Sequence, residues 1–106
     1  MSEKKIMLVC AAGMSTSLLV SKMKKIALEK KIDADIFAEA ASKAEEKSAE
    51  EKPDIMLLGP QVRYLLKKFE DKFNFPVEVI NMRDYGTMNG ENVLKKAIEI
   101  IDNKDI

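Results

Sequence analysis

Histidine is absent from this sequence of 106 residues, and cysteine occurs once, at Cys10. Without histidine the chain has no imidazole metal ligand, no imidazole acid or base, and no Ser–His or Cys–His nucleophile pair. A single cysteine cannot form a disulfide within the chain, which is typical of a reducing compartment, and we expect the cytoplasm. The residues themselves imply neither a metal nor an organic cofactor.

Net charge and long apolar runs are also missing. The 18 basic and 18 acidic residues are largely interspersed apart from an acidic stretch at 45–51, so the overall charge points neither to nucleic acid nor to an anionic membrane. No apolar run approaches the roughly 20 residues of a membrane-spanning helix, and we expect no direct membrane insertion. The apolar stretch near the N-terminus is short and behaves as a strand rather than a signal peptide.

The apolar pattern predicts alternating strands and helices within one domain spanning residues 1–106. Unbroken apolar runs predict strands at 6–9 and 55–58, and further strands are predicted at 33–39, the weakest, and at 77–80. Spacings of three and four residues predict helices from 15 and 62 and from about residue 91, and a short helix is predicted from 42. Ser42 and Glu45 form a capping-box pattern at the start of the second helix, and a polar connection is expected at 81–90.

Such alternation predicts a four-stranded parallel open sheet of order 2-1-3-4, with helices on both faces. Ligands of open α/β sheets bind outside the carboxyl ends of the strands, at a topological switch point. Three loops are therefore candidates for the ligand site, at 10–15, 59–61 and 81–90. The first of them holds the only cysteine.

The loop at Cys10 leads from a buried strand directly to the start of a helix. Free backbone N–H groups and the helix dipole favour an anion there, and small residues leave the amides uncovered. Gly13 can adopt a positive φ, and three hydroxyls are available for an oxyanion. The same donors would favour a thiolate and a bound phosphoryl group. We predict Cys10 as the nucleophile and a phosphate loop of Ala11, Ala12, Gly13, Met14, Ser15, Thr16 and Ser17.

Other interpretations of Cys10 remain open at this point. A cysteine that ends a strand is often only a small buried residue. The loop lacks the G-x-x-x-x-G-K-[ST] pattern of a Walker A motif. A thiol-redox role is disfavoured because the chain contains no second cysteine to resolve a disulfide.

Nearly the whole chain resembles the enzyme IIB components, of lactose/cellobiose type, of the bacterial phosphoenolpyruvate-dependent sugar phosphotransferase system. The resemblance rests on IMLVCAAGMSTSLLVSKM at the first strand and helix, DIMLLGPQVRYLL at the third strand and PVEVINMRDYG after the fourth. It implies that Cys10 accepts phosphate from a phosphohistidine of an enzyme IIA component. Cys10 would then pass it to a sugar, such as one of cellobiose or lactose type, held by a membrane enzyme IIC component.

The fold and loop also resemble the low-molecular-weight protein tyrosine phosphatases. That family uses C-x5-R-[ST] and an aspartic acid that protonates the leaving group, whereas Thr16 occupies the arginine position here. This departure favours a phosphocarrier over a hydrolase, because a hydrolase needs stronger stabilisation of transition-state charge. Asp84 lies where the general acid would be expected, although a solvated loop carboxylate is the favoured interpretation. A third alternative is a non-catalytic module that binds phosphate or a partner through the same loop.

Several residues outside the Cys10 loop are weaker candidates. The third-strand loop could border the phosphate loop or simply end a strand, and the connection after the fourth strand could fold over it. Met14 could contact the donor protein or pack under a neighbouring loop. The lysines of the first helix could attract an acidic partner, although solvated helix faces are commonly rich in lysine. The candidate neighbours of the phosphate loop are Gly59, Pro60, Gln61, Asp84 and Tyr85.

Overall fold

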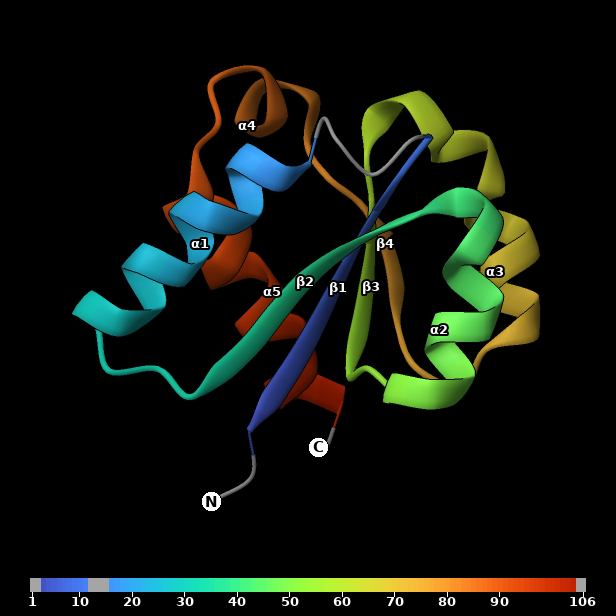
Figure 1. The fold of residues 1–106 in the computed structure, drawn as a ribbon, viewed down its shortest axis with the longest axis horizontal. Helices are drawn as coiled ribbons and strands as arrows, with labels where there is room; N and C mark the ends of the chain where they lie inside the picture. Colours follow the sequence, from blue (N-terminus) through green and yellow to red (C-terminus); the bar gives the residue numbers. More distant parts are fainter. Residues whose placement is uncertain (1–2, 12–15, 105–106) are drawn as a thin grey trace.

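Four parallel strands form the centre of the protein in a computed structural model that describes residues 3–11 and 16–104. They are β1 (Lys4–Cys10), β2 (Ala34–Ala40), β3 (Ile55–Leu58) and β4 (Val77–Val79), as Figure 1 shows. Their order is β2-β1-β3-β4 and every neighbouring pair is parallel. The predicted sheet order, direction and number of strands are confirmed.

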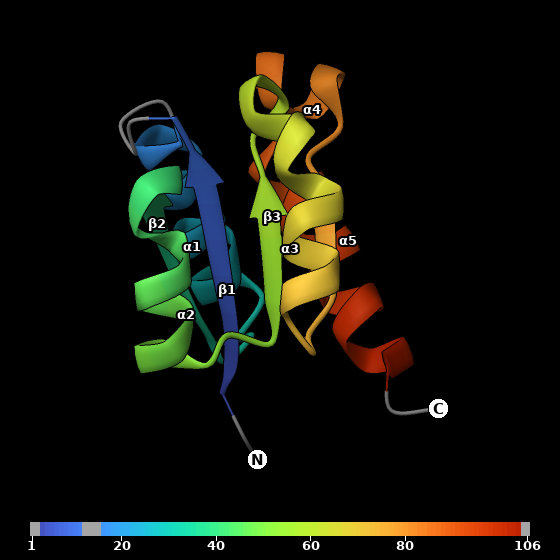
Figure 2. The same cartoon turned by 90° about the vertical axis from the view of Figure 1, so that its right-hand side faces the viewer.

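Helices cover both faces of this sheet, as predicted (Figures 1 and 2). On one face, α1 (Ser17–Glu29) and α5 (Gly90–Lys104) pack over Ile6 and Leu8 of β1. On the other face, α2 (Ala44–Glu51) and α3 (Leu66–Lys72) pack over Met7 and Val9. Both faces of β1 are buried, which explains its unbroken apolar run.

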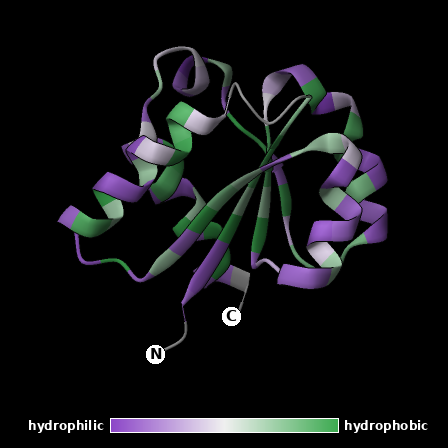
Figure 3. Ribbon diagram, in the orientation of Figure 1, coloured by the Kyte–Doolittle hydropathy of each residue, from purple (hydrophilic) through white to green (hydrophobic). Residues whose placement is uncertain are grey.

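The packing of α1 against α5 depends on a close approach at Gly90, the first residue of α5. A Cβ atom at Gly90 would lie 3.0 Å from Lys22 Cβ and 3.1 Å from the backbone nitrogen of Met23. Glycine therefore lets the start of α5 approach the backbone of α1. The hydropathy colouring in Figure 3 shows apolar and polar residues alternating around both helices, as expected for helices with one buried face.

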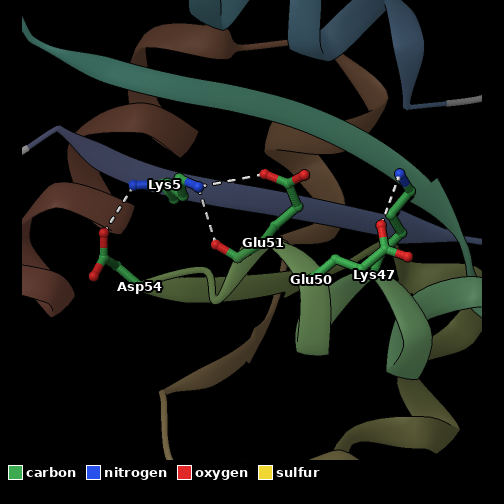
Figure 4. Close-up of polar contacts among 5 residues, drawn as sticks. All are labelled: Lys5, Lys47, Glu50, Glu51 and Asp54. Atoms are coloured by element: carbon green, nitrogen blue, oxygen red, sulfur yellow. Dashed lines mark hydrogen bonds and ion pairs between the residues drawn. The ribbon is translucent and has the colours of Figure 1, made fainter.

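Polar contacts join the amino-terminal ends of the central strands β1 and β3, at the end of the sheet opposite Cys10 (Figure 4). The backbone N–H of Lys5 donates to Asp54 Oδ2 at 2.8 Å. Lys5 Nζ donates to the carbonyl oxygen of Glu51 at 3.1 Å and forms an ion pair with its carboxylate at 3.3 Å. The connection between α2 and β3 is thereby held against β1.

Three helical segments differ from the sequence prediction. The capping box was wrong: Ser42 lies in a 3₁₀ turn (Ala41–Lys43), and α2 begins at Ala44 without a side-chain cap. β2 continues to Ala40, which pairs with Cys10. Ser42 therefore lies in the turn that follows the strand and not at the start of the helix. The segment after β3 is not one α-helix, because a 3₁₀ helix (Pro60–Leu65) with a non-helical Val62 precedes α3. The expected polar connection contains a further helix, α4 (Met82–Gly86).

The helices on the α2–α3 face are joined by exposed ion pairs. Lys72 Nζ lies 3.1 Å from a carboxylate oxygen of Glu45, and Lys68 Nζ lies 3.6 Å from the other. The hydrogen bond from Lys72, together with the charges of Lys72 and Lys68, lowers the pKa of Glu45. Across residues 3–11 and 16–104, no helix combines the length and the apolar character needed to span a bilayer.

Candidate functional site

Cys10 is the last residue of β1 and lies at the carboxyl edge of the sheet. Its side chain is fully buried. The chain leaves β1 toward β2 and leaves β3 toward β4, so the connections diverge between these two central strands. Cys10 thus lies at the topological switch point, where the sequence predicted a ligand site.

Thr16 lies against the sulfur of Cys10 in the structure. It is fully buried, and its Oγ1 donates a hydrogen bond to Cys10 Sγ at 3.5 Å. Although Thr16 is the N-cap of α1, its side chain makes no capping hydrogen bond to the helix. The hydroxyl is therefore directed at the sulfur, at the position where a tyrosine phosphatase would carry arginine.

The remainder of the predicted phosphate loop is described only in part. Ala11 is an exposed bend after β1, and Ser17 is the exposed first residue of α1. The predictions for Ala12, Gly13, Met14 and Ser15 concern positions outside the described residues.

The loop after β3 borders Cys10. The backbone N–H of Gly59 donates to the carbonyl oxygen of Val9 at 2.7 Å. A Cβ atom at Gly59 would lie 3.4 Å from that oxygen and 3.7 Å from Cys10 Cβ. Pro60 is buried and begins the 3₁₀ helix, whereas Gln61 is exposed. The structure therefore brings this loop to the base of Cys10, and a role in phosphate binding stays a prediction.

The segment after β4 forms the helix α4 because Asn81 caps it. Asn81 Oδ1 accepts hydrogen bonds from the backbone N–H groups of Arg83 and Asp84, at 2.9 and 3.2 Å. Asparagine before a polar stretch is an N-cap signal that the sequence analysis missed. Tyr85 is buried by α4 in the core that contains Leu19 and Met23. Its hydroxyl is buried and has no hydrogen-bond partner among the described atoms.

Asp84 is directed toward α5. Its Oδ1 accepts a hydrogen bond from Asn92 Nδ2 at 3.1 Å. Its side chain also lines a hollow of about 150 Å³ beside β4, together with Ile80, Val93 and other residues. This arrangement engages the carboxylate with α5, as expected for a structural rather than an acid-catalytic group.

We therefore predict that Asp84→Asn leaves the lifetime of a phosphorylated Cys10 unchanged within about twofold. The amide keeps an oxygen that can accept the hydrogen bond from Asn92. The lifetime is measured by intact mass after removal of the phosphate donor. A lifetime that lengthens severalfold in Asp84→Asn would instead identify Asp84 as an acid in hydrolysis. Asn92→Ala is the control for a change in α5 alone.

The described residues offer no alternative centre based on a metal. Within 3–11 and 16–104, histidine, cysteine, aspartate and glutamate form no group of three that could hold a metal ion. The described part of the site thus consists of one thiol, one buried hydroxyl and the neighbouring backbone, which suits covalent chemistry on an anion.

Comparison with known proteins agrees with this geometry. The sequence model of the family described as "PTS system, Lactose/Cellobiose specific IIB subunit" matches residues 5–96. A galactose-specific EIIB component of Lactococcus lactis subsp. cremoris is 44% identical over 96% of this chain and 100% of its own. An oligo-beta-mannoside-specific EIIB component of Bacillus subtilis is 42% identical over 95% of this chain and 99% of its own.

Two solved structures are similar in fold. The cellobiose-specific phosphotransferase IIB component of Borrelia burgdorferi has a TM-score of 0.80 at 44% identity, covering 97% of this chain and 95% of its own. The lactose-specific IIB domain of Streptococcus pneumoniae has a TM-score of 0.78 at 15% identity, covering 93% and 98% respectively. At that identity the second structure supports the fold alone.

Proposed function

The chain belongs to the lactose/cellobiose-specific IIB family of the sugar phosphotransferase system, and from this we propose that Cys10 is its phosphate carrier. Components of this type are phosphotransferases within that system. The observation that carries the assignment to Cys10 is the hydrogen bond from the buried Thr16 hydroxyl to Cys10 Sγ. This donor lies at the start of α1, where the helix dipole also favours negative charge.

The proposed reaction has two in-line transfers. The Cys10 thiolate attacks the phosphorus of a phosphohistidine on the donor, forming the S–P bond as the N–P bond breaks, and the departing imidazole takes up a proton. In the second transfer a sugar hydroxyl attacks the same phosphorus and loses its proton. The S–P bond breaks and the thiolate is regenerated. Positioning and electrostatic stabilisation supply the catalysis, as in other phosphoryl transfers.

A carrier must hold its phosphoryl group until the acceptor arrives. Two features favour this over hydrolysis. Threonine replaces the phosphatase arginine at residue 16 and supplies a single neutral donor, and Asp84 hydrogen-bonds to Asn92. Weak stabilisation of the hydrolytic transition state is expected to give a phosphocysteine that persists.

The proposed partners follow from the family. The donor is an enzyme IIA component and the acceptor is an enzyme IIC component in the membrane, so we place the carrier in the cytoplasm. The relatives are named for galactose, cellobiose and oligo-beta-mannosides. We therefore propose a sugar of this group, such as a β-linked disaccharide of the cellobiose type.

The test is intact-mass spectrometry near neutral pH after incubation with a phosphorylated enzyme IIA component. We expect a persistent gain of one phosphoryl group in the wild type and no gain in Cys10→Ala. Steady release of inorganic phosphate without an adduct would support a phosphatase instead. A phosphoryl group retained by Cys10→Ala would show that another residue carries it.

A further inference from the structure

The outer face of α1 differs in charge from the rest of the protein. Helix α1 contains three lysines, Lys22, Lys24 and Lys25, and one glutamate, Glu29, a net charge of +2. Because the whole chain has 18 basic and 18 acidic residues, the other residues together carry −2. The interspersion of charges seen along most of the sequence is therefore broken on this helix.

This face is also partly apolar. We define the outer face of α1 as the exposed positions of the helix other than its first residue. Leu18 is 55% exposed and Leu28 is 81% exposed, and they are two of the four large apolar side chains most exposed among the described residues. They lie ten positions apart along the helix, which is roughly 15 Å. The members of the outer face are Leu18, Ser21, Lys22, Lys24, Lys25, Leu28 and Glu29.

Neighbouring elements neutralise little of this charge. Along one side, Lys22, Lys25 and Glu29 line a shallow hollow together with residues 88–91. Besides Glu29 of the helix itself, the acid in this hollow is Glu91, which forms an ion pair with Lys30 at 2.8 Å. The hydrogen bond and charge of Lys30 lower the pKa of Glu91, so this acid is engaged with a lysine at the far end of the helix.

We propose that the outer face of α1 binds the surface of an anionic phospholipid membrane. Lysines are attracted to anionic headgroups by net charge, and the two leucines can enter the boundary between headgroups and acyl chains. The face contains no aromatic residue and no arginine, which are the usual anchors of protein–protein interfaces, whereas lysine is depleted there. The composition thus favours a lipid surface over an acidic protein.

The position of this face relates membrane binding to phosphate transfer, and this argument rests on the proposed function. Thr16, at the start of α1, contacts Cys10, and α1 lies along the outside of the molecule (Figure 1). Binding through α1 would hold the phosphorylated carrier at the membrane that contains the acceptor. Electrostatic attachment of this kind is reversible, so the carrier could return to its donor.

The test is flotation of the purified protein with vesicles of phosphatidylcholine alone or with 30% phosphatidylglycerol. We expect flotation only with the anionic vesicles and a decrease as salt is raised. Each lysine near an anionic surface changes the partition constant about fivefold, so Lys24→Gln/Lys25→Gln should weaken binding on the order of 25-fold. Leu28→Gln should weaken it as well. The matched control Lys67→Gln/Lys68→Gln removes two exposed lysines from α3, on the opposite face, and should bind like the wild type.

Three results would overturn the proposal: no flotation with anionic vesicles, equal flotation with neutral vesicles, or equal weakening by the α3 variant. A loss of phosphate transfer from the donor in Lys24→Gln/Lys25→Gln, with no flotation of the wild type, would assign the face to an acidic protein instead. Cys10→Ala should float like the wild type. Membrane binding and phosphate carriage can therefore fail independently in these measurements.

Discussion

Thr16→Val is expected to slow phosphorylation of Cys10 by about 10- to 150-fold. The substitution keeps the branched shape of a fully buried side chain and removes the hydroxyl that donates to Cys10 Sγ. A hydrogen bond to a charged group contributes about 1.5–3 kcal/mol, which corresponds to this range of rates if the bond is made to the thiolate or the developing phosphoryl charge. The rate is measured in a single turnover with excess phosphorylated donor, followed by intact mass.

A matched variant separates the hydroxyl from the shape of the side chain. Thr16→Ser retains the donor, loses one methyl group, and should remain within about threefold of the wild type. Alkylation of Cys10 by iodoacetamide should slow in Thr16→Val, because this reaction also needs the thiolate but no donor protein. If Thr16→Val is phosphorylated and alkylated at the rates of the wild type, the hydroxyl has no part in the chemistry.

Phe69→Ala is expected to lower the free energy of unfolding by about 3–5 kcal/mol, because it deletes a large buried ring. Phe69 is 1% exposed and belongs to the core under the sheet face that includes Val9. Its ring centroid lies 5.5 Å from that of Phe73. Because domains are commonly stable by only about 5–15 kcal/mol, a loss of this size should be evident as a lower urea midpoint.

Tyr64→Ala is the control, because it removes an aromatic ring from the same segment at a position that is 75% exposed. Its unfolding free energy should change by no more than about 0.5 kcal/mol. A loss below about 1 kcal/mol in Phe69→Ala would show that this part of the core relaxes around the deleted ring. That result would contradict the expectation that burial of Phe69 contributes several kcal/mol to stability.

β1 and β3 were predictable because each is buried on both faces and therefore carries an unbroken run of apolar residues. The β3 prediction matches the structure residue for residue, and β1 is longer by two lysines at its start and by Cys10 at its end. The spacing of Val62 and Leu65, three residues apart, suits a 3₁₀ helix as well as an α-helix. Apolar spacing could therefore locate the segment after β3 but could not show that it begins as a 3₁₀ helix.

The helix α4 was missed for a related reason. Its five residues bury one core side chain, Tyr85, and a single buried residue produces no period. The cap at Asn81 was the local signal. The capping box at Ser42 fails in the opposite way: the pattern is present, but the length of β2 places the residue in a turn before the helix.

The sequence by itself determined the sheet and the order of its elements, and it predicts Cys10 as the reactive residue. It could do so because strand burial leaves a local pattern, and because one cysteine and no histidine leave few nucleophiles. Tertiary structure alone decided which groups meet Cys10 and which do not. Thr16 turns from its own helix to the sulfur, Gly59 approaches from another strand, and Asp84 binds Asn92. Such contacts depend on how separate elements pack, and no spacing within one segment specifies them.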